Sequence, residues 1–460
     1  MMALASFKTA QSVVGLSESP LFYHQYSSVT AAISTLAKTQ HELKIVRKIF
    51  QEHWLRYLCW LKGSKIHWQT DGVSLFREYS KCLKDTQYIH KANVKVPGNK
   101  PVGIGYPLSL VNIADFASSW SVPFEMRRVK SYEDAILVGA DQIKEICERE
   151  EFKGFLHINA CDSSYGTAKY IAQVFAIENL VSVIRLRHGI KVWVSEERKT
   201  GGADQIYGEQ YYLTEQTGVK KYHKKEKGYE VKQISIYDRK ADLISDIEKV
   251  TRKGKRLRIE LRRWKGLKMR TKNGYSMKEV EFDVVGIRVL KKETGERVFK
   301  QDVFVAIVGE ERERMSLEEC AEEFYHRFDL EVTNRFMKQN LFLQGYETAE
   351  VQHLDNWLLI VQEAMWLLWA GSREVEKVSS KWQKYSEPKE EKGGRKTASQ
   401  TRKGLERLFM TFEKEPFVPQ KCKKGIGRQK GEIQEKRLEY KVVKKGKAVG
   451  NWTKPSLQTE

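Results

Sequence analysis

The sequence has few cysteines, and none is placed as a zinc site or a disulfide framework requires. Its six cysteines, scattered over 460 residues, form no CxxC or CxxH pair. Structural zinc sites need thiolates and imidazoles at short spacings, and disulfide-rich domains need many closely spaced cysteines. The sequence therefore indicates neither class, and it fits a protein of the reducing cytosol.

Long uninterrupted apolar runs are also missing. The most apolar stretch, LDNWLLIVQEAMWLLWAG from Leu354, is interrupted by Gln362 and Glu363 and has the spacing of a core helix that ends near Gly371. The first residues lack the basic start and the apolar stretch of a secretory signal. We therefore expect a cytoplasmic protein with no membrane span and no membrane partner.

The chain is strongly basic, and the excess is unevenly distributed. It carries 81 Lys and Arg against 60 Asp and Glu, a net charge of +21, and 11% of its residues are aromatic. This combination favours a polyanionic partner with stacking surfaces, and nucleic acid is the leading candidate. Residues 381–460 alone hold 22 Lys and Arg against 10 Asp and Glu. We expect this segment to be a basic, partly flexible DNA-binding tail.

Apolar spacing and composition divide the rest of the chain into four regions. Residues 1–75 are predicted to be helical and are a candidate DNA-binding region, with an undetermined partner. Residues 76–197 begin with three short extended stretches, and the whole region has the order β-β-β-α-β-α-β, which is characteristic of the ribonuclease-H-like fold. Residues 198–300, rich in Lys, Gly and Tyr, are predicted to form a mostly β insertion. Residues 301–380 complete this α/β core with a buried strand and a long helix.

That long helix carries an unusual row of charges. At about 100° per residue, Arg327, Glu331 and Lys338 fall in one narrow row with apolar residues on both flanks, pointing away from the ordinary solvent face. Burying such charges without partners costs several kcal/mol each. The row should therefore face either an internal salt-bridge network or a cleft that holds metal and phosphate.

Two aspartates precede this helix in an informative order. Asp162 directly follows the apolar strand GFLHINAC, although by itself it is most simply a helix cap. Asp85, in LKDTQ, lies in a short predicted strand. Together with Glu331, these residues have the order required by a fold in which two strand-borne aspartates and one helix-borne glutamate converge. Three carboxylates are suitable ligands for Mg²⁺ or Mn²⁺.

The spacing of the helical charges resembles a known signature. Arg327, Glu331 and Lys338 reproduce all but the first position of the Y-x2-R-x3-E-x6-K signature of bacterial insertion-sequence transposases of the DDE class, in the insertion-sequence-four-like branch. The segment ACDSSYGTAKY is similar to that family's second-aspartate segment, and KDTQ with GNKPVGIGYPLSL is similar to its first. Phe324 occupies the position of the signature tyrosine, and Tyr325 is the neighbouring hydroxyl.

The resemblance implies a fold, an activity and a set of residues. It implies an α/β, ribonuclease-H-like core in which Asp85, Asp162 and Glu331 are catalytic and hold two Mg²⁺ or Mn²⁺ ions; Asp71 and Asp115 compete with Asp85 for the first position. It also implies a cytoplasmic, nucleoid-associated enzyme that binds double-stranded terminal inverted repeats, cuts at the ends and joins them to target DNA within a homodimer or larger synaptic complex. The alternatives are a nuclease of the same fold without strand transfer and a catalytically inactive, transposase-derived DNA-binding protein.

Other side chains are candidates for contacts with DNA. Arg327 and Lys338 would bind phosphates next to the metal ions. Arg185 and Arg187, which alternate out of the strand LVSVIRLR, would extend this phosphate track, or would instead protect an exposed edge strand. Trp264 lies among basic residues in RIELRRWKGLKMR and is predicted to stack on an unpaired base, with a buried core tryptophan as the alternative.

Overall fold

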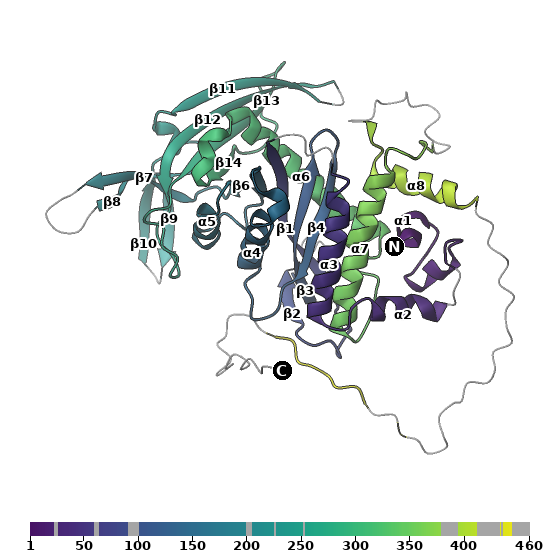
Figure 1. The fold of residues 1–460 in the computed structure, drawn as a ribbon. Coiled ribbons are helices and arrows are strands. Elements are labelled where there is room, and N and C mark those ends of the chain that lie inside the picture. The colour runs from purple at the N-terminus through teal and green to yellow at the C-terminus, as the bar shows by residue number, and fades with distance from the viewer. Residues whose placement is uncertain are drawn as a thin grey trace, which may run out of the picture.

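The protein has a mixed α/β fold built on one large sheet, with helices on both faces (Figure 1). The structure is a computed structural model. It describes residues 1–22, 26–58, 64–90, 101–198, 205–224, 227–251, 254–378, 394–411, 433 and 436–443.

The central part of the sheet combines parallel and antiparallel strands. Its strands are β1 (Lys65–Phe76), β3 (Val102–Asp115), β4 (Trp120–Arg128), β5 (Leu156–Cys161) and β6 (Leu180–Leu186). Strand β5 lies between β1 and β6 and is parallel to both, whereas β3 is antiparallel to β1 and to β4. The short strand β2 (Gln87–His90) pairs with the start of β3. Strand β1 lies within the region that we predicted to be helical, so the helical N-terminal region is shorter than expected.

Helices α4 (Ala135–Cys147) and α5 (Ala168–Phe175) connect β4, β5 and β6 and pack together. Helix α6 (Leu317–Asn340) packs on strands β5, β6, β13 (Phe282–Lys291) and β14 (Val303–Val308), through a core that includes Phe324. A capping box begins this helix, because Ser316 and Glu319 bond reciprocally to each other's backbone. Asp134 caps the start of helix α4, where its side chain accepts a bond from Ile136 N.

The predicted insertion is mostly β, and most of its strands continue the central sheet, whereas residues 218–224 and 227–233 pair with each other in a separate two-stranded sheet. Strand β14 (Val303–Val308) pairs with β6 and β13, and β12 then pairs with β13, β7 and β11. The remaining strands are β7 (Lys191–Arg198), β8 (Gln205–Tyr212), β9 (Gly218–Lys224), β10 (Lys227–Gln233), β11 (Leu243–Val250), β12 (Arg256–Lys268) and β13 (Phe282–Lys291). The short 3-10 helices η3 (Ile236–Asp238) and η4 (Glu310–Arg314) complete this part.

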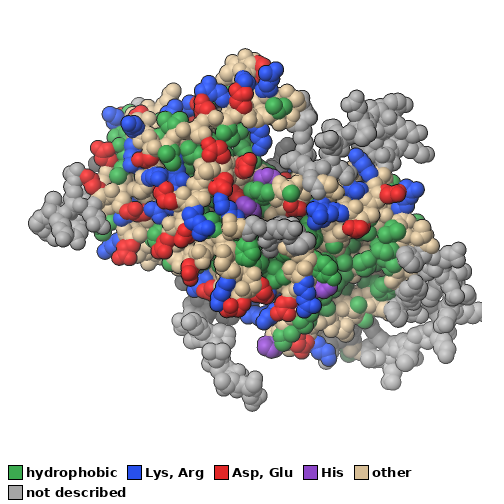
Figure 2. Space-filling view, turned by 45° about the horizontal axis from the view of Figure 1, so that its top comes forward, with side chains coloured by type: hydrophobic (Ala, Val, Ile, Leu, Met, Phe, Trp, Pro, Cys, Tyr) green, Lys and Arg blue, Asp and Glu red, His purple; other side chains and the backbone are tan. Residues whose placement is uncertain are grey.

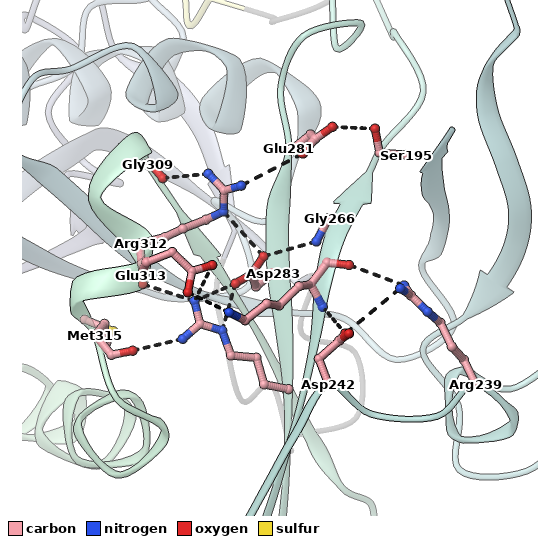
Figure 3. A network of polar contacts seen from close by, with 12 residues as sticks. Ser195, Arg239, Asp242, Gly266, Glu281, Asp283, Gly309, Arg312, Glu313 and Met315 are labelled. Atoms are coloured by element: carbon pink, nitrogen blue, oxygen red, sulfur yellow. Dashed lines mark hydrogen bonds and ion pairs between the residues drawn. The ribbon is translucent and has the colours of Figure 1, made fainter. Parts of the chain in front are cut away.

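A buried ion pair fixes the insertion to the start of α6 (Figure 3). Arg263 Nε on β12 donates to Asp283 Oδ2 on β13 at 2.7 Å, and both side chains are almost fully buried. Arg263 also donates to the backbone carbonyls of Arg312 and Met315, directly before α6. Removing one partner would leave a buried charge uncompensated, so this pair couples the position of α6 to the sheet.

The N-terminal helices gather around the long core helix α7. They are α1 (Met2–Ser6), η1 (Val14–Glu18), α2 (Tyr26–Thr35) and α3 (Gln40–Leu55), and α7 spans Val351–Gly371, ending at the predicted glycine. Trp54 of α3 stacks on Trp366 of α7 with ring centroids 5.5 Å apart. No helix in the described part of the chain is long and apolar enough to cross a bilayer.

Part of the predicted basic tail belongs to the folded body. Helix α8 (Ala398–Phe409) packs against α1 and α7 (Figure 1). Arg402 donates to the carbonyl of Phe7 at 3.0 Å, and Arg395 Nε lies 3.2 Å from Asp115 Oδ2. Further on, Val443 N donates to the carbonyl of Thr86 on the segment before β2. The segment predicted as a basic, partly flexible tail therefore includes a folded helix, α8, and its residues 381–393, 412–432, 434–435 and 444–460 lie outside the described residues.

Candidate functional site

Asp71 and Asp162 occupy neighbouring positions at the ends of a parallel pairing. The register of β1 and β5 pairs Thr70 with Cys161, and the two aspartates are the next residues along the chain. Burial raises the pKa of Asp71 to about 6, and the negative charges of Asp162 and Glu331 act in the same direction. The carboxylates at the end of β5 and on α6 are therefore both close enough to repel the charge of Asp71.

Glu331 extends from α6 with Arg327 one turn before it. Arg327 Nη2 lies 3.2 Å from Glu331 Oε1, and the exposed fraction is 5% for the arginine side chain but 47% for the glutamate. The guanidinium stacks 4.6 Å from the centroid of the Phe328 ring, and its Nε has no hydrogen-bond acceptor among the described residues. Arg327 also acts to lower the pKa of Asp71, so this cation lies near two of the three acids.

Lys338, two turns further along α6, is electrostatically coupled to Asp71. Partial burial lowers the pKa of its ammonium group, and the charge of Asp71 acts in the opposite direction. The predicted row of charges thus faces strands β1 and β5. Because Glu331 remains half exposed, this arrangement favours a solvent-accessible group of acids and cations over a closed internal salt-bridge network. We refer to Asp71, Asp162 and Glu331 as the acidic cluster.

Asp162 is held by its own loop and does not cap the following helix. Ser164 N donates to Asp162 Oδ1, whereas α5 begins only at Ala168, after Thr167. The loop lies tightly on β6, because a Cβ atom at Gly166 would lie 2.9 Å from the carbonyl oxygen of Arg185. The helix-cap interpretation is therefore wrong, and the loop fixes where the carboxylate stands.

Asp85 does not join the acidic cluster. It lies before β2 with φ of 61°, where both carboxylate oxygens accept a bond from Ser131 N at 3.1 to 3.2 Å. Arg128 Nη1 lies 3.6 Å from its Oδ2. The competitor Asp115 is paired with Arg395 instead. The prediction that Asp85 is the first acid is therefore wrong. The strand beside β5 is β1, so Asp71, and not Asp85, lies next to Asp162.

Arg185 lies on the next strand beside Asp162. The register of β5 and β6 pairs Cys161 with Ile184, which makes Arg185 the neighbour of Asp162, and its side chain is exposed. Val183 lies two residues before Arg185 on the same face of β6, and it belongs to the core under α6. Arg185 therefore points to the face that carries α6. Arg187 is also exposed, just after β6 ends. Because β6 lies between β5 and β14, the interpretation as edge protection is wrong.

Two aromatic side chains do not lie where DNA contacts would require them. Trp264 is fully buried, and its Nε1 donates to the carbonyl of Arg239 at 3.0 Å. It packs edge-on against Tyr237 and is therefore a core residue, which overturns the predicted base stacking. The hydroxyl of Tyr325 is buried, and Lys249 lies over its ring. Tyr325 therefore does not present the hydroxyl that is missing at Phe324.

The donor atoms of the acidic cluster suit a hard divalent cation. A bound cation would relieve the repulsion that raises the pKa of Asp71, and oxygen ligands are those that Mg²⁺ and Mn²⁺ prefer. In the conformation described, however, no three His, Cys, Asp or Glu side chains among the described residues are gathered as a complete metal site. Searches of protein-family models and of curated proteins found no match to this chain.

Proposed function

We propose that this chain is a DDE-class DNA transposase that uses Asp71, Asp162 and Glu331 for metal-dependent cleavage and strand transfer. The observation that carries the proposal is the convergence of these three acids with Arg327 and Lys338, whose spacing matches the family signature. Asp71 takes the role that we had expected for Asp85.

The order of the elements supports a ribonuclease-H-like core. Leaving aside the short strand β2, the chain runs through β1, β3, β4, α4, β5, α5 and β6, which is the order β-β-β-α-β-α-β. Two acids then come from neighbouring strands and the third from a helix that packs across the sheet. This is the arrangement in which two strand-borne aspartates and one helix-borne glutamate can share metal ions.

The side chains around the cluster suit the chemistry of phosphoryl transfer. Bound Mg²⁺ or Mn²⁺ would activate a water or a 3′-hydroxyl and neutralise charge on the scissile phosphate. Asp71, Asp162 and Glu331 would hold the ions. Arg327 is preorganised by Phe328 and Glu331, and with Lys338 it would bind the phosphates beside the cut.

Arg185 and Arg187 would continue this phosphate track along β6. Their exposure contrasts with the cations of the neighbouring insertion, many of which already have partners. Arg258 is 2.6 Å from Asp246, and Lys292 is 2.6 Å from Glu248. Figure 2 shows acidic and basic side chains interspersed over the visible face, without one dominant basic patch. The proposed DNA path therefore follows α6 and β6 instead of the paired charges of β11 and β12.

A cleavage and joining assay tests the proposal. The full chain would be incubated with Mg²⁺ or Mn²⁺ and labelled duplexes containing the DNA that flanks its own reading frame, together with a target plasmid. We expect cuts that leave 3′-hydroxyl ends and joined products that require the metal. Cutting without joining would support the nuclease, and sequence-specific binding without cutting would support the inactive DNA-binding protein. Absence of all three activities would overturn the assignment.

A further inference from the structure

Strand β1 and helix α6 are joined by a regular series of polar contacts. Side chains at alternate positions of β1 contact groups on successive turns of α6, and a fourth alternate position brings Asp71 to the acidic cluster. The contacting pairs are Lys65 with Glu319, His67 with Glu323, and Gln69 with the carbonyl of His326. We call these three pairs the β1–α6 contacts.

The repeat distances of the two elements explain why the series stays in register. Two residues of a strand advance about 6.6 Å, and four residues of an α-helix advance about 6.0 Å. Contacts formed between Lys65 and Glu319 are therefore repeated at His67 with Glu323. Asp71 lies four residues after His67 on β1, and Glu331 lies eight residues after Glu323 on α6. The same spacing therefore brings Asp71 to Glu331, in agreement with the electrostatic coupling between their carboxylates.

The middle of the series is buried and sterically defined. Glu323 has a side chain that is only 2% exposed, and His67 Nδ1 is bonded to its Oε1. The ring of His67 stacks on Phe116, which stacks in turn on His326, with both pairs of ring centroids 4.1 Å apart. Phe116, from the turn between β3 and β4, thus separates two imidazoles and limits how α6 can slide along β1.

The third pair is also connected on both sides. Gln69 Nε2 donates to the carbonyl of His326 at 2.8 Å, while Gln69 Oε1 accepts a bond from Ser121 Oγ at 2.6 Å. The carbonyl of Ser121 accepts from Thr333 Oγ1 at 2.8 Å. Strands β1 and β4 are thereby both bonded to α6, on either side of the turn that carries Glu331.

We propose that His67 and Glu323, with Lys65 and Glu319, are positioning residues that set the register of α6 so that Glu331 stands opposite Asp71. Their catalytic consequence rests on the proposed function, whereas the register itself does not. These residues contact neither the acids' metal-binding oxygens nor, in the proposal, the DNA. Losing them should therefore lower turnover and leave DNA affinity nearly unchanged, since misplacement by about 1 Å can cost about 100-fold in rate.

The register can be tested without DNA, by hydrogen exchange of the backbone amides of residues 327–338. His67→Leu should raise their exchange at least tenfold, because it leaves Glu323 buried without its partner. The double variant His67→Leu/Glu323→Leu removes the buried charge as well, so it should fold while α6 remains less protected. Glu322→Gln, which changes an exposed carboxylate next to Glu323, is the matched control and should leave exchange unchanged.

A charge swap provides the rescue. Lys65→Glu places two carboxylates together and should raise exchange and lower turnover, and adding Glu319→Lys should restore both. Unchanged amide protection in His67→Leu and Lys65→Glu, or no rescue by the swap, would overturn the register proposal. If protection responds as expected but the unaltered chain never cuts DNA, the proposed function fails and the register inference stands.

Discussion

Asp71 and Asp162 follow directly after a pair of neighbouring residues on parallel strands, Thr70 and Cys161. Beneath them, Thr70 Oγ1 donates to Asn159 Oδ1 at 2.9 Å, and Cys161 Sγ lies 3.2 Å from Tyr170 Oη. These contacts are buried, so the two strand ends are fixed relative to each other. The aspartates are consequently held near each other even though their charges repel, which is the arrangement expected of a site that binds cations.

The first prediction separates Asp71 from Asp85. Asp71→Ala should lower metal-dependent cleavage by several orders of magnitude with DNA affinity within a few-fold, because in the proposed mechanism its carboxylate would act on the metal and the transition state. Asp85→Ala should retain cleavage, since among the described residues that side chain accepts a bond from Ser131 N and pairs with Arg128, away from the acidic cluster. Cleavage rates and binding would be measured on the same duplex. The reverse result would return the first acid to Asp85 and refute our reading of the geometry.

The second prediction concerns stability and pH. The pKa of Asp71 is about 6 in the folded chain and lower in the unfolded chain. Ionisation of this carboxyl therefore lowers the free energy of unfolding. This loss of stability is absent below about pH 4 and complete above about pH 6. Asp71→Asn removes the penalty and should raise the free energy of unfolding at pH 7.5 by about 1 to 3 kcal/mol. Denaturant titrations of both proteins at pH 4 and pH 7.5 measure the difference.

The direction of the pH dependence provides the decisive control for that experiment. The advantage of Asp71→Asn over the unaltered chain should grow as the pH rises through the range from about 4 to 6 and then stay constant. Saturating Mg²⁺ at pH 7.5 should reduce the advantage, because a bound cation stabilises the native state of the unaltered chain by linkage. If the difference in free energy of unfolding between the two proteins is the same at pH 4 and pH 7.5, the surroundings of Asp71 do not raise its pKa.

Local periodicity was sufficient to predict α6 but not the first acid. Arg327, Glu331 and Lys338 share one face of a single helix, so their relation follows from helical geometry alone. The segment KIHWQTD also holds a local signal, since Lys65, His67, Gln69 and Asp71 alternate with Ile66, Trp68 and the β-branched Thr70 as in a strand. This alternation contradicts a helical region that extends to residue 75, because strand β1 begins at Lys65. That Asp71 lies beside Asp162 could not be read locally, because it depends on pairing between distant strands.

Trp264 shows a different limit of prediction from sequence. The basic residues around it suggested an exposed aromatic, yet Arg263 is itself buried because its partner, Asp283, comes from a neighbouring strand. Charge next to an aromatic residue therefore indicates exposure only where no distant acid compensates it. Such compensation is a tertiary property that the segment RIELRRWKGLKMR does not contain.

The third prediction follows from the burial of Trp264. Trp264→Ala should destabilise the chain by about 3 to 5 kcal/mol, as truncation of a buried tryptophan does. Trp264→Phe should recover part of this loss while still lacking the bond from Nε1 to Arg239. The melting temperature should be highest for the unaltered chain, lower for Trp264→Phe and lowest for Trp264→Ala. A fully stable Trp264→Ala protein with a defect only in processing DNA ends would restore the base-stacking hypothesis.

The last prediction concerns the basic C-terminal segment, from which α8 must now be excluded. Residues 412–460 still hold 13 Lys and Arg against 6 Asp and Glu, and they follow the last described residue of the α8 region. Deleting them should weaken binding to all duplexes alike and flatten the slope of log affinity against log salt by about 0.9 for each lost phosphate contact. The acidic cluster and the packing of α8 on α1 and α7 should persist.

A second deletion, of residues 381–460, provides the comparison for this prediction. It also removes α8, with the bond from Arg402 to Phe7 and the ion pair between Arg395 and Asp115, so it should lower thermal stability as well as affinity. Duplex affinities at several salt concentrations would be measured for all three proteins. An unchanged slope after deletion of residues 412–460 would rule out an electrostatic clamp. A loss confined to terminal-repeat DNA would show instead that these residues recognise sequence, because contacts with phosphates alone weaken binding to every duplex equally.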